Sequence, residues 1–199
     1  MPAALLATKS VPGTVRDRLL DVALELFATR GYQAIGLRDL AARVGLHAGS
    51  LYAHFENKQC VLFELIEGAL CDLLADTKRR MRGASSQRER LHRFVHAFVT
   101  FNLAEKHRLL LVTREFINLN DQQQQEINQL QSHYAALLNS IISAEYANNA
   151  HTTLITEAVI GMLFGQSQWR SIDVTERYLA DTLTSFVMGM ITTEQPKHS

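Results

Sequence analysis

The sequence holds few of the residues that build disulfide-stabilised or membrane-spanning proteins. Its 199 residues include only two cysteines, three prolines and ten glycines. Cys60 and Cys71 cannot form a disulfide framework, so we expect reduced thiols in a cytoplasmic protein. No apolar run approaches the ~20 residues that a membrane-spanning helix needs, and we expect no membrane association. Because proline and glycine are scarce, long helices can form.

The chain also lacks an excess of charge of either sign. Lys and Arg total 20, and so do Asp and Glu, so the formal net charge is zero. A protein that binds nucleic acid through charge alone would be more basic. Residues 1–60 hold 7 Lys and Arg against 5 Asp and Glu, a slight excess whose sign suits DNA binding. Any DNA contact must therefore be local and depend on shape.

What the sequence does contain is apolar residues at helical spacing through nearly its whole length. The spacing predicts helices over 14–30, 37–44, 48–54, 58–82, 91–101, 109–119, 127–141, 152–169 and 174–192. Gly31, Gly45 and residues 83–86 mark breaks, and Asn120 is a candidate N-cap. We expect an all-α fold of about nine helices.

Residues 37–58, LRDLAARVGLHAGSLYAHFENK, predict two short helices joined through Gly45. A tight turn there needs a residue that tolerates positive φ, which glycine supplies. The second helix then exposes small and hydrogen-bonding residues with almost no charge: Ala48, Gly49, Ser50, Tyr52, Ala53 and His54. Such a face suits insertion into a DNA major groove about 12 Å wide.

The segment 15–66 resembles the DNA-binding domain of the TetR family of repressors. The resemblance is carried by Ala23, Phe27, Gly31-Tyr32, Asp39-Leu40-Ala41, Val44-Gly45, Gly49-Ser50-Leu51-Tyr52, His54-Phe55 and Lys58. It implies an N-terminal arm and three-helix helix-turn-helix domain over 1–57. A larger helical domain for ligand binding and dimerisation would follow over 58–199, with 58–82 as a connecting helix.

Carried over by position, the resemblance implies contacts with double-stranded DNA. Arg38 would meet a base or phosphate, and the hydroxyls of Ser50 and Tyr52 would meet phosphates. His54 and Lys58 would be further phosphate contacts. Arg38 and Lys58 can also be merely solvated charges, and Tyr52 can be mainly packed, so each role has a structural alternative.

The same segment departs from the family pattern near the recognition helix. Gly36 and His47 stand at N-caps where the family often has Ser or Thr, and histidine caps less well. Ala48 stands where Lys or Arg is frequent, which should flatten the salt dependence of DNA binding. Gly49 would let the backbone approach the DNA, and the sequence-reading positions would run from Leu46 to Ala48.

The TetR resemblance also implies an effector pocket between the middle helices, about 86–169. The candidate lining residues are Phe98, Phe101, Phe116, Tyr134, Met162 and Trp169. Core packing is the alternative for every one of them. The stretches 114–116, 134–137 and 161–163 resemble a subgroup whose effectors are acyl-CoA thioesters. A basic cluster that could receive phosphates comprises Arg79, Arg80, Arg82, Arg88, Arg90 and Arg93; a solvated helix face or an extra DNA contact is its alternative.

The last two predicted helices, 152–169 and 174–192, have little polar face, and we expect them to form a homodimer interface. Burial inside one subunit is the alternative. His92 and His96 lie four residues apart with Glu89 one turn earlier, a spacing that can hold a metal. No third ligand is evident, so we expect neither a metal nor another cofactor.

The sequence contains no nucleophile elbow, HExxH motif or phosphate-binding loop, and we expect no catalytic residue. The predicted function is a ligand-responsive transcriptional regulator, a repressor that binds a palindromic operator as a dimer. A small hydrophobic effector, in the acyl-CoA case a thioester, would release it. The alternative is a helical ligand- or partner-binding protein whose DNA binding is weak or lost.

Overall fold

The computed structural model describes residues 13–144, 150–168 and 174–192, and every regular element within these ranges is helical. The elements are α1 (Val15–Arg30), α2 (Leu37–Arg43), α3 (Ala48–Leu51), α4 (Lys58–Met81), α5 (Gln87–Ala104), α6 (Lys106–Arg114), the 3₁₀ turn η1 (Phe116–Asn118), α7 (Asp121–Ile142), α8 (Ala150–Gly165), the 3₁₀ turn η2 (Gln166–Gln168) and α9 (Glu176–Thr192). The predicted all-α fold with nine α-helices is confirmed for the described residues.

Several helices begin at a residue whose side chain accepts a hydrogen bond from an unpaired backbone N–H of the first turn. Thr14 caps α1, and Asp17 bonds back to the Thr14 N–H at 2.8 Å. Ser86 caps α5, and Asn120 caps α7 in the same reciprocal way as Thr14. Each such cap contributes about 1 kcal/mol. The apolar spacing alone placed the starts of α5 and α7 four and six residues too late, whereas the caps at Ser86 and Asn120 mark where these helices begin.

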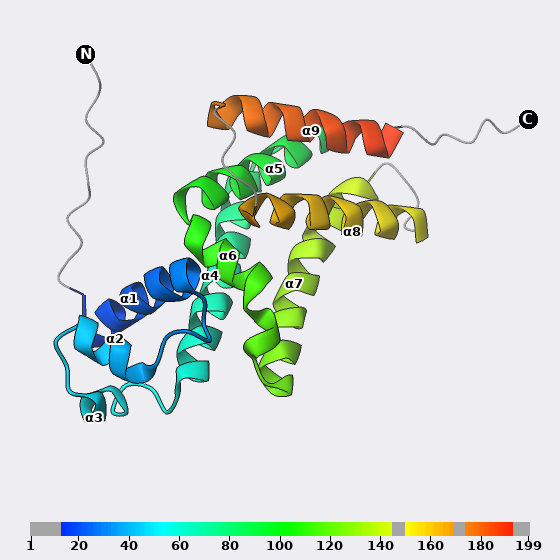
Figure 1. Cartoon of the computed structure of the whole chain (residues 1–199). Helices are drawn as coiled ribbons and strands as arrows, with labels where there is room; N and C mark the ends of the chain where they lie inside the picture. The colour runs from blue at the N-terminus through cyan, green and yellow to red at the C-terminus, as the bar shows by residue number, and fades with distance from the viewer. Residues whose placement is uncertain (1–12, 145–149, 169–173, 193–199) are drawn as a thin grey trace, which may run out of the picture.

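The helices form two ends joined by α4 (Figure 1). The three short N-terminal helices lie at one end, and α8 and α9 lie together at the other. Helix α5 packs against α4 and α9, α7 packs against α4 and α8, and α6 packs against both α1 and α4. Helix α4 therefore runs from the N-terminal helices into the centre of the larger helical part.

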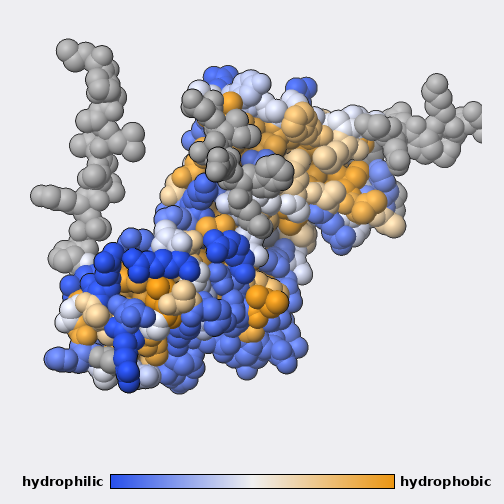
Figure 2. Space-filling view, in the orientation of Figure 1, coloured by the Kyte–Doolittle hydropathy of each residue, from blue (hydrophilic) through white to orange (hydrophobic). Residues whose placement is uncertain are grey.

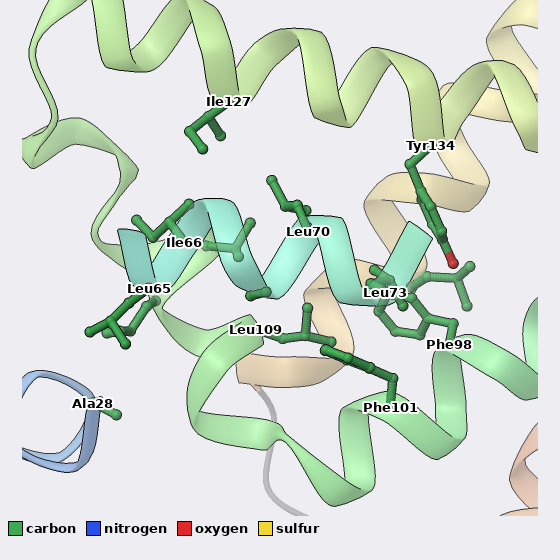
Figure 3. Packing of buried hydrophobic residues seen from close by; sticks show 14 of the residues in the cluster. Ala28, Leu65, Ile66, Leu70, Leu73, Phe98, Phe101, Leu109, Ile127 and Tyr134 are labelled. Atoms are coloured by element: carbon green, nitrogen blue, oxygen red, sulfur yellow. The ribbon is translucent and has the colours of Figure 1, made fainter. Parts of the chain in front are cut away.

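The hydrophobic core is continuous from α1 to α9. Figure 3 shows Tyr134 of α7 and Phe98 of α5 reaching toward Leu73 of α4, with Leu109 beside Phe101. Full burial of a side chain of this size contributes about 1.5–3 kcal/mol. Since one core includes the N-terminal helices, the domain boundary after residue 57 stays a prediction.

Three predicted helix ends differ from the structure. Helix α3 ends at Leu51 rather than near 54, because the chain turns at Tyr52 to bring Phe55 into the core. Helix α6 ends at Arg114, and the 3₁₀ turn η1 takes its place to residue 118. Helix α8 ends at Gly165 and continues as the 3₁₀ turn η2.

Candidate DNA-binding surface and effector domain

Helices α2 and α3 are joined by a tight turn built on Gly45. The φ angle of Gly45 is 74°, in the left-handed region that favours glycine. The turn is closed by the Leu46 N–H, which donates to the Ala41 carbonyl at 2.9 Å. Helix α2 starts at Gly36, whose N–H donates to Asp39 Oδ2 at 2.7 Å. The local sequence thus specifies both ends of the turn.

The two short helices are fixed by their buried residues. Leu40 and Ala41 of α2 are buried, as are Leu51 of α3 and Phe55 just after it. The small Ala41 side chain lets α2 and α3 approach closely. Because α3 contains only one turn, packing of Leu51 rather than helix propensity holds it in place. His47 stands at its N-cap without a side-chain capping bond, as its poor capping propensity predicts.

Most of the predicted DNA-binding side chains lie on the outside of this helix pair. Arg38, His47, Gly49, Ser50 and His54 are exposed. Tyr52 is 59% exposed, so it is not the packed residue that the alternative required. Ala48 lies in α3, but its side chain is outside the described set. The structure therefore brings the residues of the predicted contact surface to one exposed corner of the fold.

Lys58 is the exception, because its amino group points into the protein. The Nζ atom donates to the carbonyls of Tyr32 and Ile35, each at 3.0 Å, and lies 3.9 Å from the centre of the Tyr32 ring. Burial lowers the pKa of Lys58 from its ordinary value, and the negative charge of Glu115 offsets part of this effect. In this structure the Lys58 amino group is therefore turned toward the α1–α2 turn, and its contact with a phosphate stays a prediction.

The aromatic residues predicted to line a pocket are largely packed against one another. Phe98 and Tyr134 are fully buried, and Phe101 is buried. The ring centres of Phe98 and Phe164 lie 5.2 Å apart, and those of Tyr134 and Phe164 lie 6.1 Å apart. For these residues the structure shows core packing.

The remaining pocket candidates are a mixed set. Phe116 and Met162 are half-buried and pack at the edge of the same core. Trp169 lies outside the described residues. The Tyr134 hydroxyl is 3.5 Å from Thr77 Oγ1, and burial raises its pKa far above the ordinary value. Tyr134 therefore stays neutral at physiological pH.

The two histidines considered as metal ligands pair instead with carboxylates of α9. His92 Nε2 lies 2.9 Å from Asp181 Oδ1, and His96 Nε2 lies 3.7 Å from Glu176 Oε1. Within the described residues, no three His, Cys, Asp or Glu side chains come together as a metal site. The sequence predicted neither partner, because Asp181 lies 89 residues after His92 and Glu176 lies 80 residues after His96.

An open groove of about 410 Å³ lies between the start of α5 and α9. It is lined by Ser86, Arg88, Glu89, His92, Asp181, Thr184 and Ser185. Of the predicted basic cluster, Arg88 alone faces this groove. Arg79 and Arg80 pair with Asp76, and Arg93 with Glu89. Three of the six arginines are therefore already paired with carboxylates within the protein.

The sequence reasoning also missed the contacts of Arg16 and Glu115. Arg16 forms an ion pair with Glu64 of α4 and lies over the ring of Phe55. Glu115, at the end of α6, is buried and accepts a hydrogen bond from the backbone of Tyr32. Both contacts join segments far apart in the chain.

Among the described residues, no helix is both long and apolar enough to cross a bilayer.

Two family models match the chain. The model described as bacterial regulatory proteins, tetR family, matches residues 19–65. The model described as tetracyclin repressor-like, C-terminal domain, matches residues 84–191, more than half of the chain. Together they cover both the helix-turn-helix and the larger helical part, and they describe regulators rather than enzymes.

Known proteins support the same assignment. The transcriptional repressor KstR2 of Rhodococcus jostii is 38% identical over 80 residues, which are 40% of this chain and 39% of the relative. The match thus spans about two fifths of that relative's length. A tetR-family regulatory protein from Rhodococcus RHA1 superimposes with a TM-score of 0.84 at 19% identity, covering 90% of this chain and 97% of the other.

A second solved structure contains both an effector and DNA. It is AibR in complex with isovaleryl coenzyme A and operator DNA, with a TM-score of 0.78 at 18% identity. The superposition covers 87% of this chain and 97% of AibR, and at this identity it shows the fold alone. With both halves of the sequence matched by family models and the fold reproduced, this chain belongs to the TetR family of bacterial regulatory proteins.

Proposed function

We propose that this protein is a ligand-responsive transcriptional repressor that binds a palindromic DNA operator as a homodimer. The observation that carries the proposal is the exposed face of the α2–α3 pair, at Gly49, Ser50 and Tyr52, held on a buried core. This face offers hydroxyls and accessible backbone with almost no charge. Such chemistry fits close approach to phosphates and base edges in a major groove. The protein would act in the cytoplasm, where the operator lies.

The contacts that we propose follow from exposure. Arg38 and His54 lie at the rim of the face and reach phosphates or a base edge. Ser50 and Tyr52 donate hydroxyl hydrogen bonds to phosphates. At Gly49 a side chain would meet nothing within the folded subunit, so its absence leaves room for DNA. Base recognition then falls to His47 and Ala48 at the start of the helix.

The proposed dimer forms through α8 and α9, at the end of the molecule farthest from the α2–α3 pair. Figure 2 shows apolar residues gathered over this end. Leu154 of α8 is 64% exposed and Phe186 of α9 is 56% exposed, and Met190 is also exposed. Large apolar side chains exposed together mark an interaction surface. A second copy of the same face would cover them with two-fold symmetry, as a palindromic operator requires.

The proposed effector is a small hydrophobic molecule, and an acyl-CoA is the candidate to test first. Half-buried apolar residues at the edge of the core, among them Phe116 and Met162, would have to separate to admit it. AibR, which shares the fold, is described as bound to isovaleryl coenzyme A and operator DNA. An effector acts only through a difference in its affinity for two shapes of the dimer. We propose that it favours the shape whose recognition helices are too far apart for the operator.

The first experiment tests DNA binding. The purified protein is mixed with a duplex containing the DNA upstream of its own gene, and protection from nuclease is mapped. We expect a protected palindrome whose half-sites are one helical turn, about 34 Å, apart or a multiple of it. Equal affinity for that duplex and for a random-sequence duplex would contradict the proposal.

A matched pair of variants tests the surface. Arg38→Ala removes an exposed charge from α2, and Arg90→Ala removes an exposed charge from α5. If Arg38 contacts a phosphate, the Arg38→Ala variant has a shallower dependence on salt. The slope of the logarithm of the association constant against the logarithm of salt concentration becomes less negative by about one. Arg90→Ala should leave the slope as it is, because α5 lies away from the recognition helix.

The effector proposal has its own measurement. Isovaleryl-CoA is added to the preformed complex with upstream DNA, with free CoA as control. We expect the thioester to raise the melting temperature of the protein and release the duplex. An effect equal to that of free CoA would exclude recognition of the acyl group.

One observation favours the alternative of a helical binding protein with weak DNA affinity. Lys58 is turned inward, and Ala48 replaces a residue that is often basic in the family, so two phosphate contacts are missing. The alternative predicts that Tyr52→Ala leaves DNA affinity unchanged. Our proposal predicts a loss of at least about tenfold, the value of one good contact of 1.4 kcal/mol.

A further inference from the structure

The turn between α1 and α2 is held from both sides by charged side chains of the larger helical part. Tyr32 lies at the centre of this turn and is buried. On one side, Lys58 at the start of α4 donates to the Tyr32 and Ile35 carbonyls, each at 3.0 Å. The Ile35 N–H donates to the same Tyr32 carbonyl at 3.3 Å. Lys58 thus closes the turn from the α4 side.

On the other side, the end of α6 reaches the same residue. Glu115 is 7% exposed, and its Oε1 accepts from the Tyr32 N–H at 3.4 Å. Its Oε2 accepts from Asn118 Nδ2 at 2.8 Å, which orients the carboxylate. The N–H and the carbonyl of Tyr32 are therefore bound by two different helices of the larger part.

Neighbouring polar contacts continue the junction. Gln33 Nε2 donates to Asn118 Oδ1 at 2.6 Å, and Gln59 Nε2 donates to the Asn118 carbonyl at 2.8 Å. Arg114 donates to the Ala28 carbonyl at 3.4 Å, at the end of α1. All of these bonds join the α6–η1 segment to α1, to the turn after it, or to the first turn of α4. A separate ion pair between Arg16 and Glu64 joins α1 to α4.

The amino group of Lys58 is held by contacts within the protein. Two of its three N–H bonds are made to carbonyls, and the group lies against the face of the Tyr32 ring. An ammonium–ring contact of this kind contributes about 0.5–2 kcal/mol. To reach DNA, Lys58 would have to leave the partly buried Ile35 carbonyl without this donor, while the Tyr32 carbonyl would keep only the Ile35 N–H. Loss of a hydrogen-bond partner at such a group is unfavourable by about 1–3 kcal/mol.

We infer that Lys58 and Glu115 are positioning residues that set the orientation of the DNA-binding helices, and that Lys58 is not a phosphate contact. The DNA part of this inference rests on the proposed function; the positioning part does not. The pair gives the effector domain two attachment points on one turn, at α4 and at the end of α6.

The first test uses salt dependence, because it separates a phosphate contact from a positioning role. Lys58→Met, Arg38→Ala and the exposed control Lys78→Met are titrated with a random-sequence 30-base-pair duplex between 50 and 200 mM salt. We expect Lys58→Met to weaken binding while leaving the salt slope equal to that of Lys78→Met. A fall in slope of about one for Lys58→Met would show a phosphate contact and overturn the inference.

The second test needs no DNA. Amide hydrogen exchange is measured for the full chain and for Glu115→Gln, with the exposed Glu25→Gln as control. Glutamine keeps the size and one acceptor but loses the charge and the second acceptor for Asn118. We expect the amides of Tyr32 and Ile35 to exchange at least about threefold faster in Glu115→Gln alone. Unchanged exchange would overturn the positioning role.

The two variants together test whether the residues act through the same turn. If they do, the double variant Lys58→Met/Glu115→Gln loosens the Tyr32 and Ile35 amides by less than the two single effects combined. Additive effects would mean that the residues act independently and would overturn the inference. If the protein binds no duplex at all, the proposed function fails, while hydrogen exchange still decides the role of Lys58 and Glu115.

Discussion

Two buried polar side chains show how much a single residue depends on its neighbours. Tyr134 and Asn102 both lie among apolar residues of the larger helical part. The Tyr134 hydroxyl faces Thr77 Oγ1, whereas Asn102 Oδ1 has no hydrogen-bond partner. A buried acceptor without a partner is unfavourable by about 1–3 kcal/mol. The two residues therefore respond oppositely to removal of their polar atoms.

Asn102→Leu is expected to raise the free energy of unfolding by about 1 kcal/mol. Leucine has nearly the same shape and removes the unpaired oxygen of a residue that is only 8% exposed. Urea unfolding followed by circular dichroism measures the change. Asn102→Asp, which buries a charge at the same place, should instead destabilise the protein. A loss of stability in Asn102→Leu would show that the amide makes a bond that matters.

Tyr134 predicts a specific loss of stability at high pH. Burial raises its pKa above the ordinary value of 10.0, so in the folded protein the phenol keeps its proton when the unfolded chain has lost it. Its contribution is fully present below pH 10 and is lost as pH rises further, by up to about 1.4 kcal/mol per pH unit. Tyr134→Phe should show a shallower decline above pH 10 in urea unfolding. Identical slopes would mean that Tyr134 ionises in the folded state.

Lys58 shows the limit of assigning a role from position alone. The sequence places it correctly at the first residue of α4, after the recognition helix. Its side chain could point outward to DNA or inward to the Tyr32 and Ile35 carbonyls, which lie more than twenty residues earlier. Only the packing of the turn against α4 decides between the two. Residues whose partners are local, such as Asp39 at the Gly36 cap, could be assigned from the sequence.

At the scale of elements, the helix-turn-helix is predictable because its determinants are local. Gly45, the caps and the apolar positions lie within about twenty residues of one another. The pairing of α5 with α9 is different. His92 and His96 meet Asp181 and Glu176, and no signal within α5 indicates where these partners lie. The apolar spacing therefore predicted that these helices exist, but it did not predict which helices pack against each other.

Two glycines of the same element should respond differently to substitution by alanine. Gly45→Ala places a side chain at φ 74°, which is unfavourable by about 1–2 kcal/mol, although no atom lies within 4 Å of the new methyl group. Gly49→Ala meets no atom either and has no such backbone strain. We expect Gly45→Ala to lower thermal stability and Gly49→Ala to leave it unchanged.

The pair also tests the proposed approach to DNA. If the backbone at Gly49 lies against the duplex, Gly49→Ala lowers affinity for upstream DNA while its stability stays that of the parent protein. Fluorescence anisotropy with a labelled duplex measures the affinity. Unaltered affinity would mean that α3 enters the groove by another face.

At the scale of the whole molecule, the aromatic residues of the larger part illustrate that sequence cannot distinguish a pocket wall from a packed core. Phe98 and Tyr134 lie on helices that the sequence predicted correctly, and their apolar faces were equally consistent with a cavity wall. Phe164 packs against both rings, so both belong to the core among the described residues. The effector pocket between the middle helices stays a prediction.

The exposed apolar face of α8 and α9 predicts the assembly. Phe186→Lys places a charge in the proposed interface, where burial of an aromatic side chain contributes about 1.5–3 kcal/mol. We expect the dimer dissociation constant to rise at least about tenfold, measured by sedimentation equilibrium. Ile117→Lys changes another exposed apolar residue, 80% exposed on η1, and should leave the dimer intact. A dimer that tolerates Phe186→Lys would place the interface elsewhere.

By itself, the sequence determined that the chain is all-helical and where most of its helices begin. It also located the turn that presents a recognition helix, because periodicity, caps and glycines act over a few residues. Tertiary structure alone decided which aromatic rings close the core and which carboxylates meet the α5 histidines. It also decided that Lys58 meets the carbonyl of Tyr32 and Glu115 its N–H. These outcomes depend on contacts between segments that are distant in the chain, where burial and unpaired backbone groups, rather than local propensity, set the free energy.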